Sequence, residues 1–107
     1  MRFEIELTPG AVAALKALPA RTRTAVREAL ERHLRYEPTK TSKSRIKRLR
    51  GLLRPQYRLR VDEIRVFYDV TASTVEVLAV ITKAEAAAWL DDSGTPDPER
   101  GTGPSER

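Results

Sequence analysis

Arginines alternate with apolar residues in two neighbouring segments of the chain, at Arg58, Arg60 and Arg65. A guanidinium group stays charged at neutral pH and offers a planar pair of N–H donors to phosphate oxygens. Fixed cations can therefore bind a nucleic-acid backbone, and they stabilise the phosphorane formed when the 2′-hydroxyl of RNA attacks the adjacent phosphate. Lys83 adds a candidate general acid or base. A metal-independent cleavage of RNA is therefore one chemistry open to these residues, and Arg58, Arg60, Arg65 and Lys83 are the candidate catalytic residues for it.

The surrounding sequence is strongly basic. Residues 1–90 hold 18 basic and 10 acidic residues, a net charge of +8 against +5 for the whole chain, and residues 40–61 contain no acidic residue. Such a block attracts a polyanion, which is a nucleic acid, an acidic membrane surface or an acidic protein. Unpaired RNA bases also stack on aromatic side chains. The candidate RNA-binding residues are Lys43, Arg45, Lys47, Arg48, Arg50, Arg54, Phe67 and Trp89.

Other kinds of chemistry find little support in the sequence. The chain has no cysteine, which excludes disulfides and thiolate sites and fits a reducing compartment. His33 is the single histidine and is expected on a helix surface, and no glycine-rich phosphate loop or metal-ligand cluster is visible. The N-terminus lacks the long apolar stretch of a signal peptide or membrane span. We expect a cytoplasmic protein without a metal, a cofactor or a membrane segment.

These side chains must be positioned by a small set of predicted elements. Thr8-Pro9 is typical of a helix start, and Val26, Leu30 and Leu34 form the apolar stripe of a second helix. The predicted strands are residues 2–7, 57–61, 64–70 and 74–81, and the predicted helices are 9–17, 20–36 and 83–90. Residues 46–53 remain unassigned. The order β-α-α-β-β-β with a short C-terminal helix predicts an α+β fold, in which a helical hairpin packs on one face of a mostly antiparallel four-stranded sheet.

The two arginine-bearing strands are predicted to form a hairpin around a two-residue turn at Asp62-Glu63. Arg60 then faces Arg65 and Arg58 faces Phe67, while the opposite face is apolar and lies under the helices. Like charges directly across a strand pair are destabilising, so this face needs a polyanionic partner or nearby acids. Asp69 and Glu76 are the candidate acids. A longer loop would change the register.

The C-terminal segment differs in composition from the rest of the chain. Residues 91–107 contain five acidic residues, three glycines and three prolines, and no aliphatic or aromatic residue. Such a segment cannot bury enough apolar surface to offset its ordering entropy. We therefore expect one domain over residues 1–90, followed by a disordered acidic tail over 91–107.

Four segments carry a family resemblance. Leu49-Arg50-Gly51, residues 56–61, residues 64–68 and the apolar strand 75–81 resemble the RelE/ParE superfamily of toxins from type II toxin–antitoxin systems. The resemblance covers about residues 1–90. In the RelE branch it implies a ribosome-dependent endoribonuclease, an mRNA interferase that inhibits translation and is neutralised by a cognate antitoxin in a hetero-oligomer.

The resemblance also implies roles for particular residues. The basic residues of the family's hairpin fall on Arg58, Arg60 and Arg65, and a further basic residue falls on Lys83. Trp89 stands where the family has an aromatic proton-transfer residue, but an indole cannot exchange a proton as a tyrosine can. Trp89 is either a base-stacking residue or an anchor that packs the C-terminal helix on the sheet.

Two alternatives remain open. The ParE branch shares the fold and is associated with inhibition of DNA gyrase instead of RNA cleavage. A third interpretation is a catalytically weak module that binds RNA or an acidic antitoxin segment, which would neutralise the same arginines. The three interpretations share most of one surface.

Overall fold

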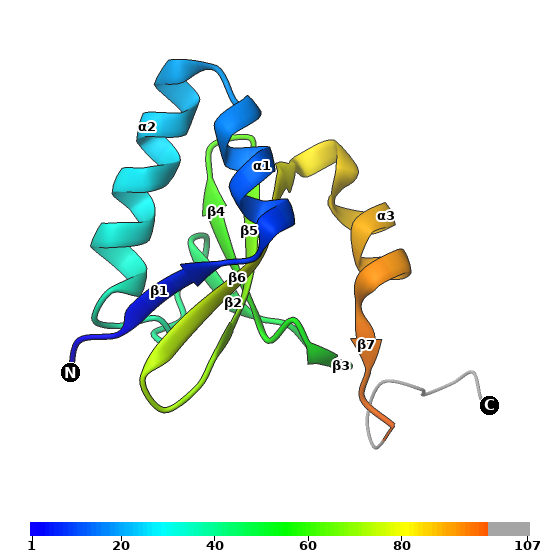
Figure 1. The fold of residues 1–107 in the computed structure, drawn as a ribbon. Coiled ribbons are helices and arrows are strands. Elements are labelled where there is room, and N and C mark those ends of the chain that lie inside the picture. The colour runs from blue at the N-terminus through cyan, green and yellow to red at the C-terminus, as the bar shows by residue number, and fades with distance from the viewer. Residues whose placement is uncertain (99–107) are drawn as a thin grey trace.

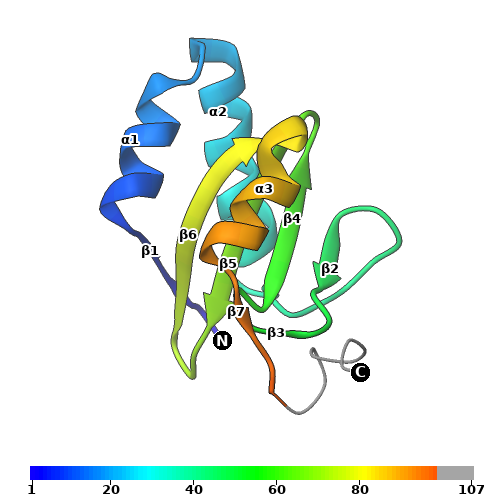
Figure 2. The same ribbon diagram turned by 90° about the vertical axis from the view of Figure 1, so that its right-hand side faces the viewer.

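The structure is a computed structural model that describes residues 1–98. Helices α1 and α2 lie on one side of the main sheet, and α3 lies on the other (Figures 1 and 2). The helical elements are α1 (Pro9–Ala17), α2 (Ala20–Ala29), the π-helical turn η1 (Leu30–Leu34) and α3 (Lys83–Ser93). The strands are β1 (Glu4–Leu7), β2 (Ile46–Arg48), β3 (Leu52–Arg54), β4 (Tyr57–Val61), β5 (Ile64–Val70), β6 (Thr74–Thr82) and β7 (Thr95–Pro96).

The predicted α+β architecture is confirmed, with one strand more than expected in the main sheet. The order is β1-β6-β5-β4-β2, in which β1 runs parallel to β6 and the other neighbours are antiparallel. The four-stranded prediction omitted β2, because three residues are too few to show an alternating pattern. Ile46 in β2 pairs with Leu59 and is buried, so this short strand is held by the core as well as by backbone hydrogen bonds.

The helical hairpin follows the predicted pattern. The Thr8 hydroxyl accepts a hydrogen bond from the Ala11 N–H at 3.2 Å and caps α1, and Pro9 occupies its first turn. The apolar stripe Val26, Leu30 and Leu34 is buried against the sheet. The second predicted helix begins as expected at residue 20 but finishes as the π-helical turn η1, which ends at Leu34.

The core lies between the helical hairpin and one face of the sheet. Leu59, Val66, Tyr68 and Val77 are fully buried there. The Tyr68 hydroxyl donates to the Pro38 carbonyl at 2.7 Å, and burial raises the pKa of this phenol. The predicted apolar face of the β4–β5 hairpin is therefore the core face, and the arginines of β4 and β5 lie on the other side of the sheet.

The C-terminal helix continues past the predicted domain boundary. Helix α3 begins with a reciprocal capping box between Thr82 and Glu85 and runs to Ser93. Strand β7 then pairs with β3, and the Asp97 N–H donates to the Gly51 carbonyl at 3.0 Å. The chain turns at Gly94, where a Cβ atom would lie 2.6 Å from the Leu90 carbonyl oxygen.

The prediction that disorder begins at residue 91 is therefore wrong for residues 91–98. These residues are ordered by helix continuation and by backbone pairing with β3, neither of which needs the large apolar side chains that the prediction relied on. The rest of the predicted tail, residues 99–107, lies outside the described residues. Within residues 1–98, no helix has the length and apolar character needed to cross a membrane.

Candidate nucleic-acid interface

The β4–β5 hairpin has the predicted register. Val61 pairs with Ile64 across the turn at Asp62-Glu63, and Asp62 takes a positive φ of 52° that a two-residue turn requires. Arg60 consequently lies opposite Arg65, and Arg58 lies opposite Phe67, as predicted. We call Arg58, Arg60 and Arg65 the arginine cluster. Because side chains alternate across a strand, all three project from the sheet face opposite the helical hairpin.

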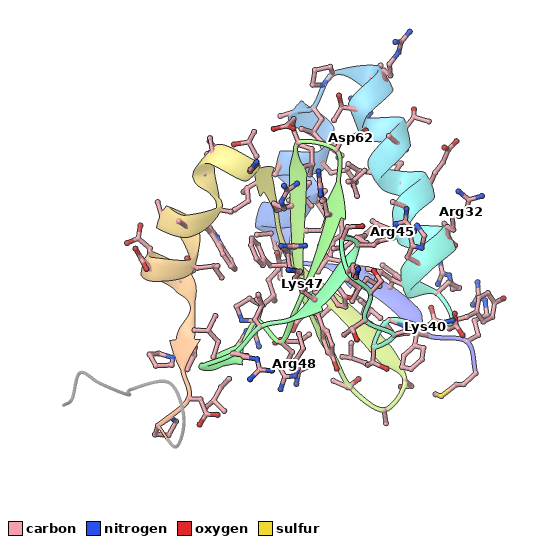
Figure 3. All side chains as sticks on the ribbon, turned by 180° about the vertical axis from the view of Figure 1, so that it is seen from behind. Arg32, Lys40, Arg45, Lys47, Arg48 and Asp62 are labelled. Atoms are coloured by element: carbon pink, nitrogen blue, oxygen red, sulfur yellow. The ribbon has the colours of Figure 1, made fainter. Side chains whose placement is uncertain are left out.

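Arg65 is the buried member of the cluster, with 7% of its surface exposed. Its Nη1 donates to the carbonyl oxygens of Asp62 at 2.7 Å and Ile64 at 3.1 Å. These contacts fix the guanidinium at the hairpin turn, whose tip is marked by Asp62 in Figure 3. Within residues 1–98, Arg65 forms no ion pair with a carboxylate. The sequence marks Asp62 only as a turn residue. The backbone geometry of the turn also leaves its carbonyl oxygen available to accept the hydrogen bond from Arg65.

Arg58 is half-buried and incompletely satisfied. Its Nη2 donates weakly to the Ser44 carbonyl at 3.5 Å, and its buried Nε makes no hydrogen bond within residues 1–98. Burial lowers the pKa of Arg58, and the neighbouring Arg65 and Arg60 act in the same direction. An arginine shifted in this way still carries its proton at neutral pH. The positive charges of the cluster therefore repel one another in a partly dehydrated place, and an anion bound there would relieve this repulsion.

The expected carboxylate partners of the cluster have another role. Asp69 Oδ2 lies 3.6 Å from Arg54 Nε, and Glu76 Oε1 lies 3.3 Å from Arg54 Nη2. The expectation that Asp69 and Glu76 compensate the hairpin arginines is therefore wrong. Both acids are instead occupied by Arg54, which β3 brings to the end of β5 away from the hairpin turn. Arg54 is 15 residues before Asp69 in the chain, so local sequence patterns do not reveal this contact. We call Arg54, Asp69 and Glu76 the Arg54 ion-pair group. The charge of Arg54, a predicted RNA contact, is already neutralised by these two carboxylates.

Lys83 lies at the end of the sheet that carries the hairpin turn. It is the first residue of α3, and its backbone N–H donates to the Glu63 carbonyl at 2.7 Å. Ile81, two residues earlier, pairs with Arg65 in the β5–β6 ladder. The structure thus brings the exposed Lys83 to the same end of the sheet as Arg60 and Arg65.

Phe67 does not face solvent as predicted. Only 1% of its surface is exposed, and its ring stacks on Trp89 with 5.2 Å between centroids and 12° between planes. The prediction that Phe67 stacks on an RNA base is therefore wrong, because α3 folds back over this part of the sheet. Trp89 anchors α3 through this contact, and one face of its indole is already occupied.

The other predicted RNA-binding residues lie around β2 and the loops beside it. Lys47 pairs with Arg58 across β2 and β4 and is exposed, so it extends the arginine cluster by one strand (Figure 3). Arg48 lies over the Tyr57 ring at 5.3 Å and donates to the Gln56 carbonyl at 2.9 Å. The remaining members are exposed at the sheet edge: Lys43, Arg45 and Arg50.

In residues 1–98, no group of three or more His, Asp or Glu side chains is placed to hold a metal ion. The chemistry offered by the arginine cluster is the binding of phosphates and the stabilisation of negative charge.

Comparison with known sequences decides the family. Residues 5–87 match the sequence profile of a family described as the ParE toxin of the type II toxin–antitoxin system parDE. The chain belongs to this toxin family. It is a toxin of the RelE/ParE superfamily of type II toxin–antitoxin systems. The family match ends before Trp89, so this residue, the end of α3 and β7 lie beyond it.

Solved structures of toxins from toxin–antitoxin systems share the fold of this chain. The RelBE2 toxin–antitoxin complex of Mycobacterium tuberculosis matches with 27% identity and a TM-score of 0.65, covering 77% of this chain and 99% of the matched chain. The RelE–RelB complex of Pyrococcus horikoshii matches with 26% identity and a TM-score of 0.64, covering 78% and 97%. The YoeB dimer of Staphylococcus aureus shares the fold at 17% identity and a TM-score of 0.57, covering 76% and 97%. No curated protein sequence gives a significant match.

Proposed function

We propose that this toxin is RelE-like: an mRNA interferase that acts in the cytoplasm, cuts mRNA on the ribosome and so inhibits translation. The observation that carries the proposal is the arginine cluster, in which Arg60 and Arg65 lie directly opposite each other. Within residues 1–98 the nearby acids Asp69 and Glu76 are paired with Arg54 instead. A partly buried cluster of positive charge without carboxylate partners is suited to the phosphates of RNA.

The proposed reaction uses the nucleophile of the substrate. The 2′-hydroxyl of RNA attacks the adjacent phosphorus, the bond from phosphorus to the 5′-oxygen breaks, and a 2′,3′-cyclic phosphate and a 5′-hydroxyl are formed. Arg58 and Arg60 stabilise the negative charge that develops on the phosphorane oxygens, while the contacts of Arg65 with the turn fix the geometry of the cluster. DNA lacks the 2′-hydroxyl and is not cut.

Two protons must move in this reaction, and the arginines remain charged throughout. Lys83 is the candidate for proton transfer among the predicted catalytic residues, because it is exposed at the same end of the sheet as Arg60 and Arg65. Trp89 is committed to Phe67 and carries no exchangeable acid of suitable strength. In this proposal, groups of the ribosome supply whatever proton transfer Lys83 does not.

A cognate antitoxin is the proposed protein partner. Two of the matched structures, from Mycobacterium tuberculosis and Pyrococcus horikoshii, are complexes of a RelE-type toxin with its antitoxin. An acidic antitoxin segment lying on the arginine cluster would compete with RNA for the same charges, and the toxin would be held in an inactive hetero-oligomer.

DNA gyrase is the second candidate target. The matching family profile is that of ParE toxins, a branch associated with gyrase inhibition. The four predicted catalytic residues, Arg58, Arg60, Arg65 and Lys83, include no tyrosine or histidine to act as an acid–base group, which also favours this alternative. A gyrase inhibitor would need the surface for binding alone.

The test is a reconstituted translation reaction in which the ends of the mRNA are mapped on ribosomes. The wild type is expected to cut mRNA in the decoding site, and Arg60→Gln is expected to lose most of this activity. Lys16→Gln, an exposed change on α1, is the matched control. Intact mRNA with the wild type, together with inhibition in a DNA supercoiling assay, would replace the RelE-like function by the gyrase function.

A further inference from the structure

A second basic site lies on the other side of β2 from the arginine cluster. A cavity of about 220 Å³ opens between η1 and the loop that leads into β2. This volume is many times what one water molecule needs and is enough for a phosphodiester group. The side chains that define it are Arg32, His33, Glu37, Lys40, Ser42 and Arg45.

The charge of this cavity is positive. Arg32, Lys40 and Arg45 contribute three cations, while Glu37 is the single carboxylate in the lining and lies 3.8 Å from Lys40. Burial lowers the pKa of His33, and the nearby charges of Arg45 and Arg32 lower it further. A neutral imidazole offers one N–H donor to an anion without adding to the repulsion.

The cavity wall is ordered by the loop before β2. The Ser42 hydroxyl accepts hydrogen bonds from the N–H groups of Arg45 at 3.0 Å and Ile46 at 3.4 Å. The Ser42 N–H in turn donates to the Ile46 carbonyl at 3.0 Å. The opposite wall is η1, a π-helical turn, which is a rare conformation that proteins often place at functional sites. The hydrogen-bonded loop before β2 therefore holds Arg45 on one wall of the cavity, and the π-helical turn η1 holds Arg32 on the other.

Arg45 lines the cavity and is also hydrogen-bonded to the arginine cluster. The Arg60 N–H of β4 donates to the Arg45 carbonyl at 2.9 Å, so Arg45, the last loop residue before β2, lies beside a member of the arginine cluster. In Figure 3, Arg45 lies between Lys47 and the pair Arg32 and Lys40. Lys47 pairs with Arg58 of the arginine cluster, whereas Arg32 and Lys40 line the cavity. A polyanion lying on the arginine cluster and crossing the short edge strand β2 reaches the cavity next.

We propose that this cavity binds a backbone phosphate of RNA, as a second anchor beside the arginine cluster. The assignment rests on the proposed RNA-binding function and adds to it a separate site formed by η1 and the loop before β2. RNA is favoured over a free anion because a chain of phosphates is the ligand that occupies two adjoining basic sites at once. Arg45 and Arg32 are the principal ligands, and His33 lies beside the bound phosphate.

The first test measures the binding of a single-stranded RNA, made uncleavable by 2′-O-methyl groups, over a range of salt concentrations. Arg45→Gln and Arg32→Gln are each expected to weaken binding by about 3- to 10-fold. Each is also expected to reduce the slope of log affinity against log salt by roughly 0.7, the value for one lost phosphate contact on a single strand. Arg21→Gln, an exposed change in the first turn of α2, is the matched control and leaves both quantities unchanged.

The result that overturns the proposal is an affinity and a salt slope in Arg45→Gln and Arg32→Gln equal to those of Arg21→Gln. If Arg60→Gln still weakens RNA binding in the same experiment, the second site fails while the proposed function stands. If the wild type binds RNA with the expected variant effects but leaves mRNA intact in translation, the second site stands and the cleavage function fails.

A second measurement identifies the ligand through the His33 ring signals in an NMR titration. The uncleavable RNA is expected to shift these signals in the wild type and to shift them less in Arg45→Gln. A shift with inorganic phosphate, combined with unchanged RNA affinity in Arg45→Gln, would make this a free-anion site and overturn the assignment to RNA. Loss of antitoxin binding in Arg45→Gln with unchanged RNA affinity would overturn it in favour of an acidic protein segment.

Discussion

The sheet face opposite the helical hairpin carries two groups of arginine that differ in their partners. In the arginine cluster, Arg60 and Arg65 face each other, and Arg65 contacts backbone carbonyls. In the Arg54 ion-pair group, at the other end of β5, one arginine lies between Asp69 and Glu76. Arg54 and the three arginines of the cluster all count toward the same basic composition.

The difference shows that charge in the sequence and free charge on the surface are separate properties. The Arg54 ion-pair group uses its charges to hold β3 against β5 and β6, which makes it a structural contact. In the arginine cluster, the like charges repel one another, and this repulsion destabilises the fold unless an anion binds. Between the two groups, Phe67 and Trp89 cover the sheet and connect α3 to it.

The largest expected effect concerns this aromatic contact. Phe67→Ala should lower the free energy of unfolding by about 3–5 kcal/mol, because it removes a buried ring and the support of Trp89. Urea denaturation measures the change, and Phe67→Leu is the control that keeps most of the volume. An unfolding free energy unchanged by Phe67→Ala would mean that the ring is not packed under α3.

The next prediction concerns stability, because removing an arginine should change the free energy of unfolding in opposite directions in the two groups. Arg60→Gln should raise the free energy of unfolding by about 0.2–1 kcal/mol, since it removes one of two like charges that face each other. The gain should shrink at high salt, which screens exposed charges. Urea denaturation at low and high salt tests this, with Arg21→Gln as the control. A loss of stability at both salt concentrations would show that Arg60 has a stabilising partner.

The corresponding change in the other group should act in the opposite direction. Arg54→Gln should lower the free energy of unfolding by no more than about 1 kcal/mol, because its ion pairs are half-exposed and screened. Glu76→Gln, which removes one of the two pairs, should give a smaller loss. Denaturation of both variants checks the order, and a gain in stability from Arg54→Gln would contradict the pairing.

The smallest expected effect is a change in pH dependence at Asp69. Burial raises the pKa of Asp69 above its ordinary value of 3.8, outweighing the opposing hydrogen bond from the Gln56 N–H and the attraction of Arg54. The folded chain therefore holds this proton more tightly than the unfolded chain does. Its stability should fall as the pH rises from about the ordinary value to the raised pKa.

Comparison with Asp69→Asn isolates this contribution. The free energy of unfolding of the wild type, measured by urea denaturation at a series of pH values, should decrease relative to that of the variant across the same window. A relative increase with pH would mean that Arg54 and Gln56 outweigh burial and that the pKa is lowered.

Sequence patterns predicted the hairpin well because its determinants are local. Alternation over β4 and β5 and a two-residue turn suffice to place Arg60 opposite Arg65, and Thr8-Pro9 marks the start of α1 through a cap made three residues away. The same patterns identified the family by its arginines, and the roles of those arginines stay predictions.

The features that were missed depend on contacts between distant segments. β7 pairs with β3 more than 40 residues earlier in the chain, and neither strand is long enough to show an alternating pattern. Arg54 meets Glu76 across 22 residues, and Phe67 is buried only because α3 folds back on it. Local hydrophobic periodicity carries no information about such pairings.

The most direct test is a paired measurement of RNA affinity in Arg60→Gln and Arg54→Gln, because each variant removes one arginine from one of the two groups. Arg60→Gln should weaken the binding of uncleavable single-stranded RNA by about tenfold or more and reduce the salt slope by roughly 0.7. Arg54→Gln should change the affinity by less than about twofold, since its charge is already neutralised. Equal losses in the two variants would show that RNA responds to total charge and would contradict the arginine cluster as the site.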